Sequence, residues 1–388
     1  MRIVDISAYF VYPPRSGGQE RIFGFNHAMS KYAKIEQFSF TPVLMRKKTF
    51  YHNKNYSEHV YPSLLYTAGV VFLKIFGIIN YDFIIPIVFR LKRMPDKLKE
   101  ALQNADLVQV EHPWLLEWIA RQSNKPVVLV EHNIESELQK DFFKGNIFRE
   151  CIVKSIEKTE KNAVEKAKMV FSMCNDDKEK LSRMYRIEKN KLVIVPNGVL
   201  LSNYTLKLSK EEARRKLGLR KSSNIVLFVG AKHPPNDNAA SFIEKNLAPK
   251  LPNVLFLIVG NVRNKKTEAA AKNLAYTGAV NDLLPYYKAS DLAINPVASG
   301  SGSNLKMFSY FASGLPVITT RKGLRGIKAA PSKDVLVTDI NKFSISIATL
   351  IKDKKLQASL AKNSRRIAAQ YDWGAIAGKA VQCYSKAL

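Results

Sequence analysis

The sequence predicts an α/β protein built from two domains that each contain a doubly wound, mostly parallel sheet. Its length of 388 residues exceeds what one hydrophobic core comfortably fills. Short apolar runs of the kind left by buried parallel strands recur along the chain. Each is followed by a turn and then by apolar residues at helical spacing, which is the βα alternation of this fold class.

The first half opens with a predicted strand over 2–10, a loop over 11–19 that holds Gly17 and Gly18, and a helix from about 20 to 32. The loop lacks the complete G-x-G-x-x-G pattern, so no dinucleotide site is indicated. Strands are expected over 107–111 and 127–131, charged helix between 136 and 168, and further strands over 169–174 and 192–195. The turn at 196–198 ends this half.

Two of these strands end in polar clusters. Glu111-His112 and Glu131-His132 stand at the carboxyl ends of the predicted strands. Ligands of open α/β sheets bind at those ends, so these residues are candidates for chemistry. Trp114 is expected in the core, with a platform that stacks on a bound ligand as the alternative.

The second half repeats the alternation without a fixed repeat period. Strands are expected over 225–229, 254–259, 275–280, 292–297, 316–320 and 335–338, and helices near 342–352 and 372–388. Between 292–297 and the helix 305–313 lies a loop of small residues, 298–304, and Gly314 stands where a helix C-cap glycine belongs. Such a loop gathers unpaired N–H groups at the positive end of a helix dipole, which suits a diphosphate. Lys306 could add a full charge.

Net charge is unusual, at +28 with a pI near 9.8. Such a field attracts nucleic acid, anionic lipid headgroups or nucleotide-bearing ligands. No nucleic-acid-binding signature is present and the lysines form no single tract. An anionic membrane surface is an equally good partner, because each nearby basic residue adds about 1 kcal/mol of attraction. A plainly solvated basic surface is the simplest alternative.

The segment 64–91 is the most membrane-like part of the chain. Lys74, Asn80, Asp82, Pro86 and Arg90 interrupt it, so it falls short of the roughly 20 apolar residues of a membrane span. Core helices or an interfacial segment are expected there. Cys151, Cys174 and Cys383 fit no metal or disulfide spacing, which favours a reducing compartment. The first residues read as a buried strand and argue against a signal peptide.

Six stretches, in this order, resemble the GT-B glycosyltransferases of the retaining family 4, also called group 1. They are PPRSGGQER at 13–21, LVQVEHPW at 107–114, VVLVEHNIE at 127–135, VPNGV at 195–199, FVGAKHPPNDNA at 228–239 and SGSGSNLKMFSYFASGLPVI at 299–318. YDW at 371–373, before the last helix, also fits. The resemblance covers nearly the whole chain.

The resemblance implies two Rossmann-like domains facing a central cleft. Residues 1–200 would bind the acceptor, 201–371 would bind a nucleotide sugar, and the helix 372–388 would cross back to the first domain. It implies transfer of a sugar, with retention, from a UDP- or GDP-sugar to a glycan or lipid-linked acceptor in cell-envelope synthesis. No metal and no cofactor beyond this co-substrate are expected, and Asp176-Asp177 are expected in a helix first turn or cap. The expected location is cytoplasmic, possibly peripheral on the inner face of the membrane.

The resemblance also implies roles for particular residues. Lys306, His132 and Glu111 are the candidate catalytic residues, although a structural hydrogen bond is the alternative for His132. Gly17, Gly18 and Arg21 would form a phosphate or acceptor loop. The candidate donor-binding residues are Gly230, Lys232, Val280, Gly300, Ser301, Gly302, Ser303, Asn304 and Ser309.

Departures from the family pattern leave alternatives open. The family places glutamates where Ser309 and Ser301 stand, and an arginine where Ala231 stands. A serine can make only one of the two hydrogen bonds that a carboxylate accepts from the donor ribose, a loss of about 1–3 kcal/mol. A degenerate GT-B scaffold that binds without catalysis therefore stays an alternative, as does a basic nucleic-acid-binding protein. An inverting mechanism, with Glu111, His112 or His132 as base, also stays open.

Overall fold

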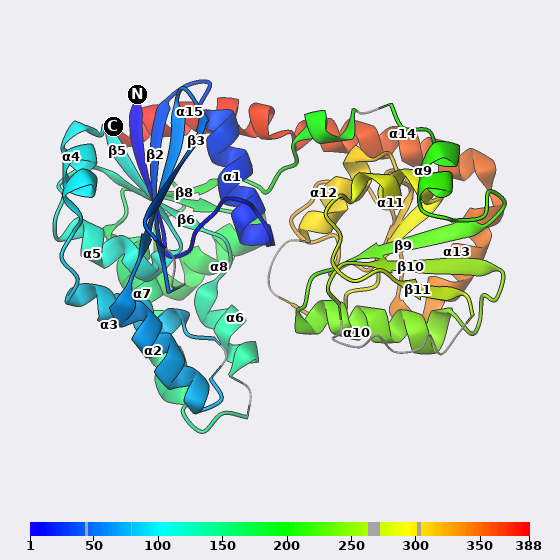
Figure 1. Ribbon diagram of the computed structural model, residues 1–388, viewed down its shortest axis with the longest axis horizontal. Coiled ribbons are helices and arrows are strands. Elements are labelled where there is room, and N and C mark those ends of the chain that lie inside the picture. Colours follow the sequence, from blue (N-terminus) through cyan, green and yellow to red (C-terminus); the bar gives the residue numbers. More distant parts are fainter. Residues whose placement is uncertain (43–45, 79, 144, 206, 263–271, 301–303) are drawn as a thin grey trace. The chain divides into compact units, whose positions relative to one another are not determined.

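The computed structural model describes residues 1–42, 46–78, 80–143, 145–205, 207–262, 272–300 and 304–388. It divides the chain into two compact units (Figure 1). Unit 1 comprises Met1–Asn197 and Trp373–Leu388, and unit 2 comprises Gly198–Asp372. The expectation of an α/β chain with two parallel-sheet domains is confirmed.

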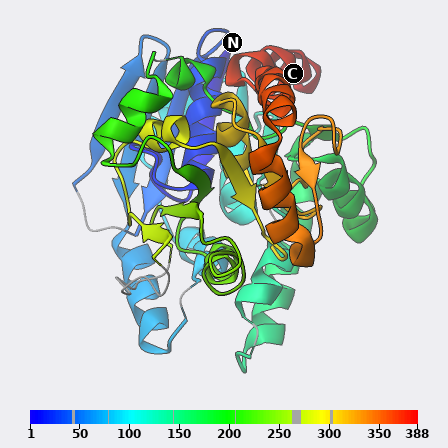
Figure 2. The same cartoon turned by 90° about the vertical axis from the view of Figure 1, so that its right-hand side faces the viewer.

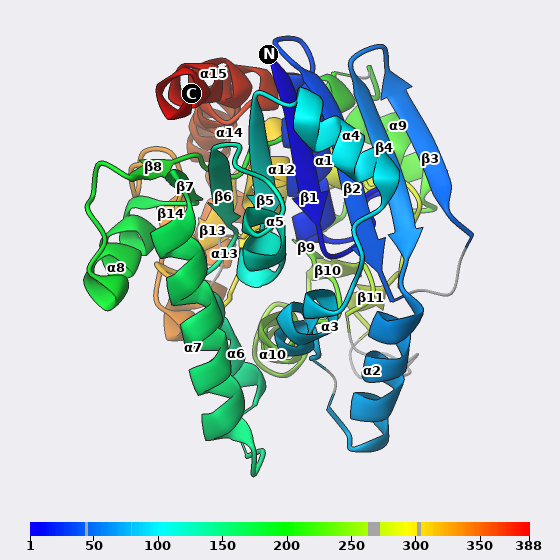
Figure 3. The same cartoon turned by 90° about the vertical axis from the view of Figure 1, so that its left-hand side faces the viewer.

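Unit 1 is built on a sheet that runs, in the described residues, in the order β3-β4-β2-β1-β5-β6-β7-β8 (Figure 3). Only the β3–β4 pair is antiparallel. The strands are β1 (Arg2–Ser7), β2 (Lys34–Thr41), β3 (Lys48–Asn53), β4 (Tyr56–Pro62), β5 (Leu107–Glu111), β6 (Val127–Glu131), β7 (Met169–Ser172) and β8 (Leu192–Ile194).

Helices cover both faces of this sheet. Trp373, at the start of α15, lies directly against Gly24 of α1, and a Cβ added at Gly24 would meet the indole. The α-helices of unit 1 are α1 (Gly17–Met29), α2 (Leu64–Ile75), α3 (Ile85–Arg90), α4 (Asp96–Asn104), α5 (Leu116–Ala120), α6 (Glu135–Phe142), α7 (Arg149–Lys166), α8 (Asn175–Tyr185) and α15 (Trp373–Ala387). Short 3-10 turns lie at η1 (Asp82–Ile84) and η2 (Pro113–Leu115).

Unit 2 has a wholly parallel sheet in the order β11-β10-β9-β12-β13-β14. Alternate residues of β9 reach opposite cores: Val226 and Phe228 pack on one face, and Ile225, Leu227 and Val229 on the other. This period of two follows from strand geometry. The strands are β9 (Asn224–Val229), β10 (Val254–Val259), β11 (Leu274–Tyr276), β12 (Leu292–Asn295), β13 (Val317–Thr319) and β14 (Leu336–Val337).

The helices of unit 2 bury both faces of the sheet, as parallel sheets require. Figure 2 views this unit with α10 seen end-on. The helices are α9 (Lys210–Lys216), α10 (Pro234–Phe242), α11 (Leu284–Ala289), α12 (Leu305–Ala312), α13 (Phe343–Lys352) and α14 (Lys354–Gln370), with short turns at η3 (Leu201–Tyr204), η4 (Ile243–Leu247) and η5 (Ile340–Lys342). Gly314 follows α12 with φ of +70°, the left-handed conformation expected of a glycine just after a helix.

Three features of unit 1 differ from expectation or settle an alternative. The helix expected from about residue 20 begins at Gly17, because Ser16 caps it through the Gln19 N–H. The strands β2, β3 and β4 were not expected. Trp114 is buried in the core, as expected. In the described part of the chain, no helix is long and apolar enough to cross a membrane.

Candidate active site

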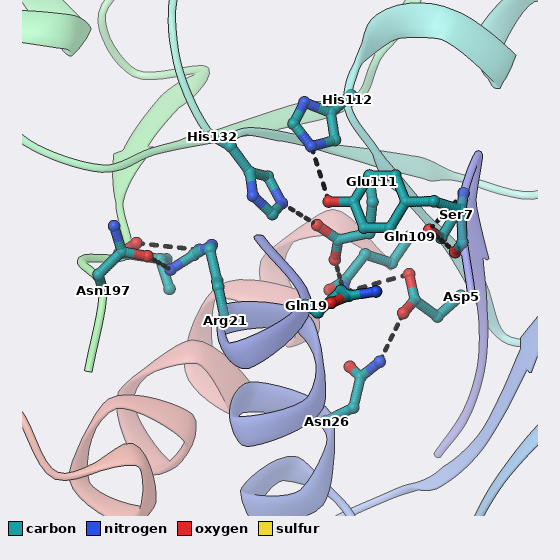
Figure 4. A network of polar contacts seen from close by, with 12 residues as sticks. Asp5, Ser7, Gln19, Arg21, Asn26, Gln109, Glu111, His112, His132 and Asn197 are labelled. Carbon is teal, nitrogen blue, oxygen red and sulfur yellow. Dashed lines mark hydrogen bonds and ion pairs between the residues drawn. The ribbon is translucent and has the colours of Figure 1, made fainter. Parts of the chain in front are cut away.

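A row of buried polar side chains crosses the middle of the unit 1 sheet. Asp5 of β1 stands in register with Gln37 of β2 and Gln109 of β5. Asn26 of α1 donates to the Asp5 carboxylate, and the Tyr384 hydroxyl of α15 bonds the Gln109 side chain. Burial, together with the charge of Glu111, raises the pKa of Asp5 well above its usual range. The row ties both helices to the sheet and leads to the strand ends (Figure 4).

Glu111 and His132 meet at the carboxyl ends of β5 and β6. Both are buried, and the Glu111 carboxyl group is hydrogen-bonded to His132 Nε2. Gln109 Nε2 donates to the other carboxyl oxygen at 2.7 Å. Burial raises the pKa of Glu111 to about 7, while burial and the charges of His112 and Arg21 lower the pKa of His132. Both shifts favour a neutral pair, in which the Glu111 O–H donates to Nε2 and His132 keeps its proton on Nδ1.

A second imidazole stacks on this pair. The rings of His112 and His132 lie 4.1 Å apart between centroids. His112 Nε2 is 3.0 Å from the Tyr9 hydroxyl, and its Nδ1 is 2.7 Å from a Glu135 carboxylate oxygen. Burial opposes the imidazolium, but the Glu135, Glu111 and Asp82 carboxylates outweigh it and raise the pKa of His112. His112 has φ of +63°, a strained conformation that clusters at functional sites.

The N-terminus of α1 approaches the same cluster. Gly17 is exposed and Gly18 half-buried at the first turn. A Cβ at Gly18 would lie 2.7 Å from the Tyr9 hydroxyl and 3.9 Å from His132 Nδ1. Only glycine permits this approach, which places the free N–H groups of a helix start beside the protonated nitrogen of His132.

Arg21 has a different position from the one expected. Its side chain is buried, with 3% exposed. The guanidinium donates to the carbonyl oxygens of Val195 and Pro196, at 3.1 and 3.0 Å, and to Asn197 Oδ1 at 3.1 Å. It also lies 5.8 Å from the Trp373 ring centroid. We therefore reassign Arg21 from a phosphate-binding loop to holding the segment that ends the first part of unit 1.

In unit 2, Lys306 lies in the first turn of α12. Its Nζ donates to Asn236 Oδ1 at 2.5 Å and lies 4.3 Å from the Phe228 ring centroid. Part of the Lys306 surface is exposed, yet the surrounding protein removes water from the ammonium group and lowers its pKa to about 7. A cation without a carboxylate partner in the described residues is suited to an incoming anion.

Two candidate glycines, Gly230 and Gly300, lie beside the first turn of α10, which contains Asn236. A Cβ at Gly230 would lie 3.2 Å from Asn236 Cβ, and a Cβ at Gly300 would lie 3.3 Å from Pro235 Cγ. Gly300 also has φ of +112°. The structure thus brings Gly230, Gly300 and Lys306 together around the first turn of α10.

The other donor-site candidates are less closely associated with this turn. Asn304 is the N-cap residue of α12 but makes no side-chain capping bond, and Ser309 is half-buried on the same helix. Lys232 is exposed, and Val280 is half-buried against the unit 2 core. Ser301, Gly302 and Ser303 lie outside the described residues.

The metal expectation concerns Asp176 and Asp177. Both lie in the first turn of α8, as expected, and Cys174 donates its thiol hydrogen to Asp177. Among the residues that the structure describes, no group of three or more His, Cys, Asp or Glu side chains is arranged to hold a metal ion.

Sequence reasoning missed Tyr9 and Asn236, and it placed Glu135 in the polar cluster after the strand 127–131 without giving it a role. Tyr9 follows β1 by only two residues, so attention to every polar residue after a strand would have found it. Asn236 lies in the stretch that carried the family resemblance, but its contact with Lys306 depends on tertiary structure.

Comparisons with known proteins agree with this architecture. The family described as Glycosyltransferase Family 4 matches residues 55–203, and the family described as Glycosyl transferases group 1 matches residues 223–353. The two matches together span more than half of the chain.

Solved structures of similar fold cover the whole chain. Sucrose-phosphate synthase from Thermosynechococcus elongatus superposes with a TM-score of 0.74 at 17% identity, covering 100% of this chain and 99% of that one. HepE of Anabaena in complex with UDP superposes with a TM-score of 0.70 at 14% identity, covering 100% of both chains. At these identities the likeness shows the fold alone.

Curated relatives match at higher identity over shorter stretches. UDP-Gal:alpha-D-GlcNAc-diphosphoundecaprenol alpha-1,3-galactosyltransferase of Escherichia coli is 27% identical over 49% of this chain and 53% of its own length. D-inositol 3-phosphate glycosyltransferase of Corynebacterium urealyticum is 26% identical over 58% of both. The chain spans little more than half the length of these relatives. It belongs to the glycosyl transferases of group 1, family 4, and has the GT-B fold.

Proposed function

We propose that this glycosyltransferase moves a sugar from a nucleotide sugar, with a UDP-sugar as the first candidate, to a hydroxyl group of a lipid-linked or glycan acceptor. The observation that carries the proposal is the desolvated Lys306 ammonium group beside Asn236 and the first turns of α10 and α12. Two similar proteins support uridine: the Escherichia coli relative is named for its use of UDP-Gal, and the structure of HepE contains UDP.

In the proposed reaction, unit 2 holds the nucleotide diphosphate. Two helix N-termini supply partial positive charge, and Lys306 supplies a full one. Negative charge develops on the diphosphate as the bond to the sugar breaks, so these groups stabilise the transition state more than the ground state. This arrangement provides charge neutralisation from the chain's own residues, which fits a reaction that needs no divalent metal.

Unit 1 is proposed to bind the acceptor and the transferred sugar at Glu111, His132 and the Gly18 turn. The Nδ1–H of His132 and the N–H groups of α1 are donors for sugar or phosphate oxygens. Same-face attack with retention of the anomeric configuration is proposed on the resemblance to the retaining family 4 enzymes. Glu111, whose pKa burial raises to about 7, is the group that would serve as general base in the inverting alternative.

A membrane surface is the proposed location of the acceptor. The outward face of α2 and the turn that follows is apolar instead of polar. Leu64, Phe72, Ile75 and Phe76 are 77%, 60%, 75% and 62% exposed. A water-facing side of this composition marks an interaction surface. Together with the net charge of +28, this apolar face of α2 fits peripheral binding to the anionic inner face of a membrane. The proposed setting is the synthesis of envelope glycans.

The test of the transfer reaction separates binding from turnover. Melting temperatures would be measured with UDP-, GDP-, ADP- and dTDP-sugars, and release of free nucleotide would be followed with diphosphate-lipid acceptors. We expect a selective shift with one nucleotide and an acceptor-dependent release that Lys306→Ala abolishes and the exposed-lysine control Lys352→Ala retains. Binding without release by any acceptor would favour the scaffold alternative. No shift with any nucleotide would overturn the proposal.

A further inference from the structure

A cavity lies in unit 1, apart from the strand-end cluster. It has a volume of about 260 Å³ and is lined by Pro86, Arg90, Lys92, Trp114, Glu117, Trp118, Arg121 and Gln122. None of these residues belongs to the group formed by Tyr9, Glu111, His112, His132 and Glu135. Its lining comes from α3, η2, α5 and the residues that follow α3 and α5.

The walls of this cavity are firmly held. Trp118 Nε1 donates to the Lys92 carbonyl oxygen at 3.1 Å. The Trp118 ring packs edge-on against Phe89 and Phe40, at 5.1 and 5.3 Å between centroids. Lys92 Nζ lies 5.2 Å from both phenyl rings. Trp114 and Trp118 are 3% and 6% exposed, so neither indole offers a free face for stacking on a sugar.

The cavity carries more positive charge than its own residues neutralise. Its single carboxylate, Glu117, is bonded by Arg121 Nη2 at 2.5 Å and faces Lys166 at 3.9 Å. Arg90 and Lys92 form no ion pair with any residue that the structure describes. Burial lowers the pKa of Lys92, and the Phe40 and Phe89 rings give its charged form weaker compensation than an anion would. An anion placed between Arg90 and Lys92 would supply that compensation.

The chain around these cations is apolar and exposed. Leu91 stands between Arg90 and Lys92 in sequence and is 82% exposed, and Ile87 on α3 is 58% exposed. α3 packs on α2, where a Cβ at Gly69 would meet Ile84 and Val88. The cationic cavity therefore adjoins the apolar outward face of α2 and α3. A ligand that fits both parts has a small anionic head and an apolar body.

We propose that this cavity binds the phosphate headgroup of an anionic membrane phospholipid. Its volume is just below the roughly 300–1,000 Å³ of drug-sized ligand pockets, which suits a headgroup better than a nucleotide sugar. Arg90 and Lys92 hold the phosphate ester and Arg121 stays bonded to Glu117, while Leu91 and Ile87 contact the acyl region. The inference rests on the membrane docking proposed above and adds lipid selectivity to it, because uncharged headgroups would leave the cations unpaired.

The cavity contains its own optical probe, since two of the chain's three tryptophans line it. Tryptophan fluorescence of the full chain would be titrated with inorganic phosphate, glycerol 1-phosphate and short-chain phosphatidylglycerol. Sedimentation would be measured with vesicles of phosphatidylcholine, with and without phosphatidylglycerol. The test variant Arg90→Gln/Lys92→Met keeps the aliphatic packing of Lys92. The control Lys354→Gln/Lys355→Gln removes the same charge from exposed lysines of α14.

We expect a saturable fluorescence change with phosphatidylglycerol that weakens about tenfold in the test variant and is unchanged in the control. Vesicle binding should depend on phosphatidylglycerol and fall in the test variant far more than in the control. Equal binding by wild type and test variant would overturn the headgroup site and leave membrane docking standing. A response to glycerol 1-phosphate without vesicle binding would overturn the lipid assignment together with the docking proposal. Nucleotide release, measured separately, reports on sugar transfer independently of both.

Discussion

The Glu111 carboxyl group is hydrogen-bonded to Nε2 of His132, although the two residues end neighbouring strands and are separated by 21 positions. The bond lies in a buried environment that disfavours charge on either partner. It leaves Nδ1 of His132 facing the turn that begins α1. Because Nδ1 carries the proton, it can donate a hydrogen bond to a ligand.

Glu111 should make stability depend on pH. Burial raises its pKa from 4.5 to about 7, so its contribution is complete below about pH 4.5 and is lost as the pH rises through about 7. Glu111→Gln keeps a neutral side chain over this range. Between about pH 5 and pH 8 its free energy of unfolding should therefore rise by about 2 kcal/mol relative to that of the wild type. Urea unfolding across this range would measure it. The exposed Glu100→Gln control should show no such trend, and parallel curves for wild type and Glu111→Gln would contradict the assignment.

Nucleotide binding should be linked to protonation of Lys306. Its pKa of about 7 in the free chain must rise when a diphosphate binds, so binding takes up a proton near neutral pH. Affinity should fall as the pH rises above about 7, by up to tenfold per unit. Calorimetry in buffers of different ionisation enthalpy would count the proton. Lys306→Met should bind more weakly and without proton uptake; an unchanged uptake would show that another group titrates.

Gly18→Ala should disturb the strand-end cluster. The new Cβ would lie 2.7 Å from the Tyr9 hydroxyl, and the shift needed to relieve this contact should cost about 1–3 kcal/mol. Adding Tyr9→Phe removes the hydroxyl and leaves the ring carbon at 3.5 Å, so the double variant should recover part of the loss. Thermal unfolding of the two single variants and the double variant would test this. Additive losses would exclude the contact as the cause.

Arg21→Met should act on stability. It removes the donor that the Val195 and Pro196 carbonyl oxygens and Asn197 Oδ1 share, a loss of about 2–4 kcal/mol. The control is Arg15→Met, because Arg15 is exposed before the same helix. Denaturant midpoints of both variants would be compared with nucleotide affinity. A normal midpoint with lost ligand binding would restore Arg21 to the phosphate loop.

The apolar face of α2 should be required for membrane binding. Phe72→Ser/Phe76→Ser removes two exposed rings and should lower partitioning into anionic vesicles at least tenfold while leaving the melting temperature near that of the wild type. Tyr51→Ser is a matched control, because Tyr51 of β3 is 78% exposed away from this face. Vesicle sedimentation would measure both. Equal partitioning of the α2 variant and the control would leave charge as the sole attraction.

Runs of apolar residues were enough to locate most of the sheet. β5, β6 and β10 have the bounds that the sequence predicts, because each is a nearly continuous apolar run closed by polar residues. The βα alternation likewise predicted two parallel-sheet domains. These features depend on local pattern, which a sequence carries directly.

The strands β2–β4 were not predicted, because polar residues interrupt their apolar pattern. Gln37 and Glu58 are 0% exposed, although their side chains read as surface residues. Glu58 is satisfied by the Ser39 hydroxyl and by the N–H groups of Val11 and Tyr12. Ser39 lies on a different strand from Glu58, and Val11 and Tyr12 lie in a distant loop. The burial of these polar residues therefore depends on contacts that no pattern within a single strand predicts.

The residue types of the candidate site could be read from the sequence, but their states and partners could not. Glu111, His132 and Lys306 were recognisable as chemically capable residues at strand and helix ends. Tertiary structure decided that the Glu111 carboxyl group bonds His132 Nε2, that Lys306 faces Asn236, and that the Arg21 guanidinium bonds the segment 195–197. The physical reason is that desolvation and hydrogen bonding are set by atoms brought together from distant parts of the chain.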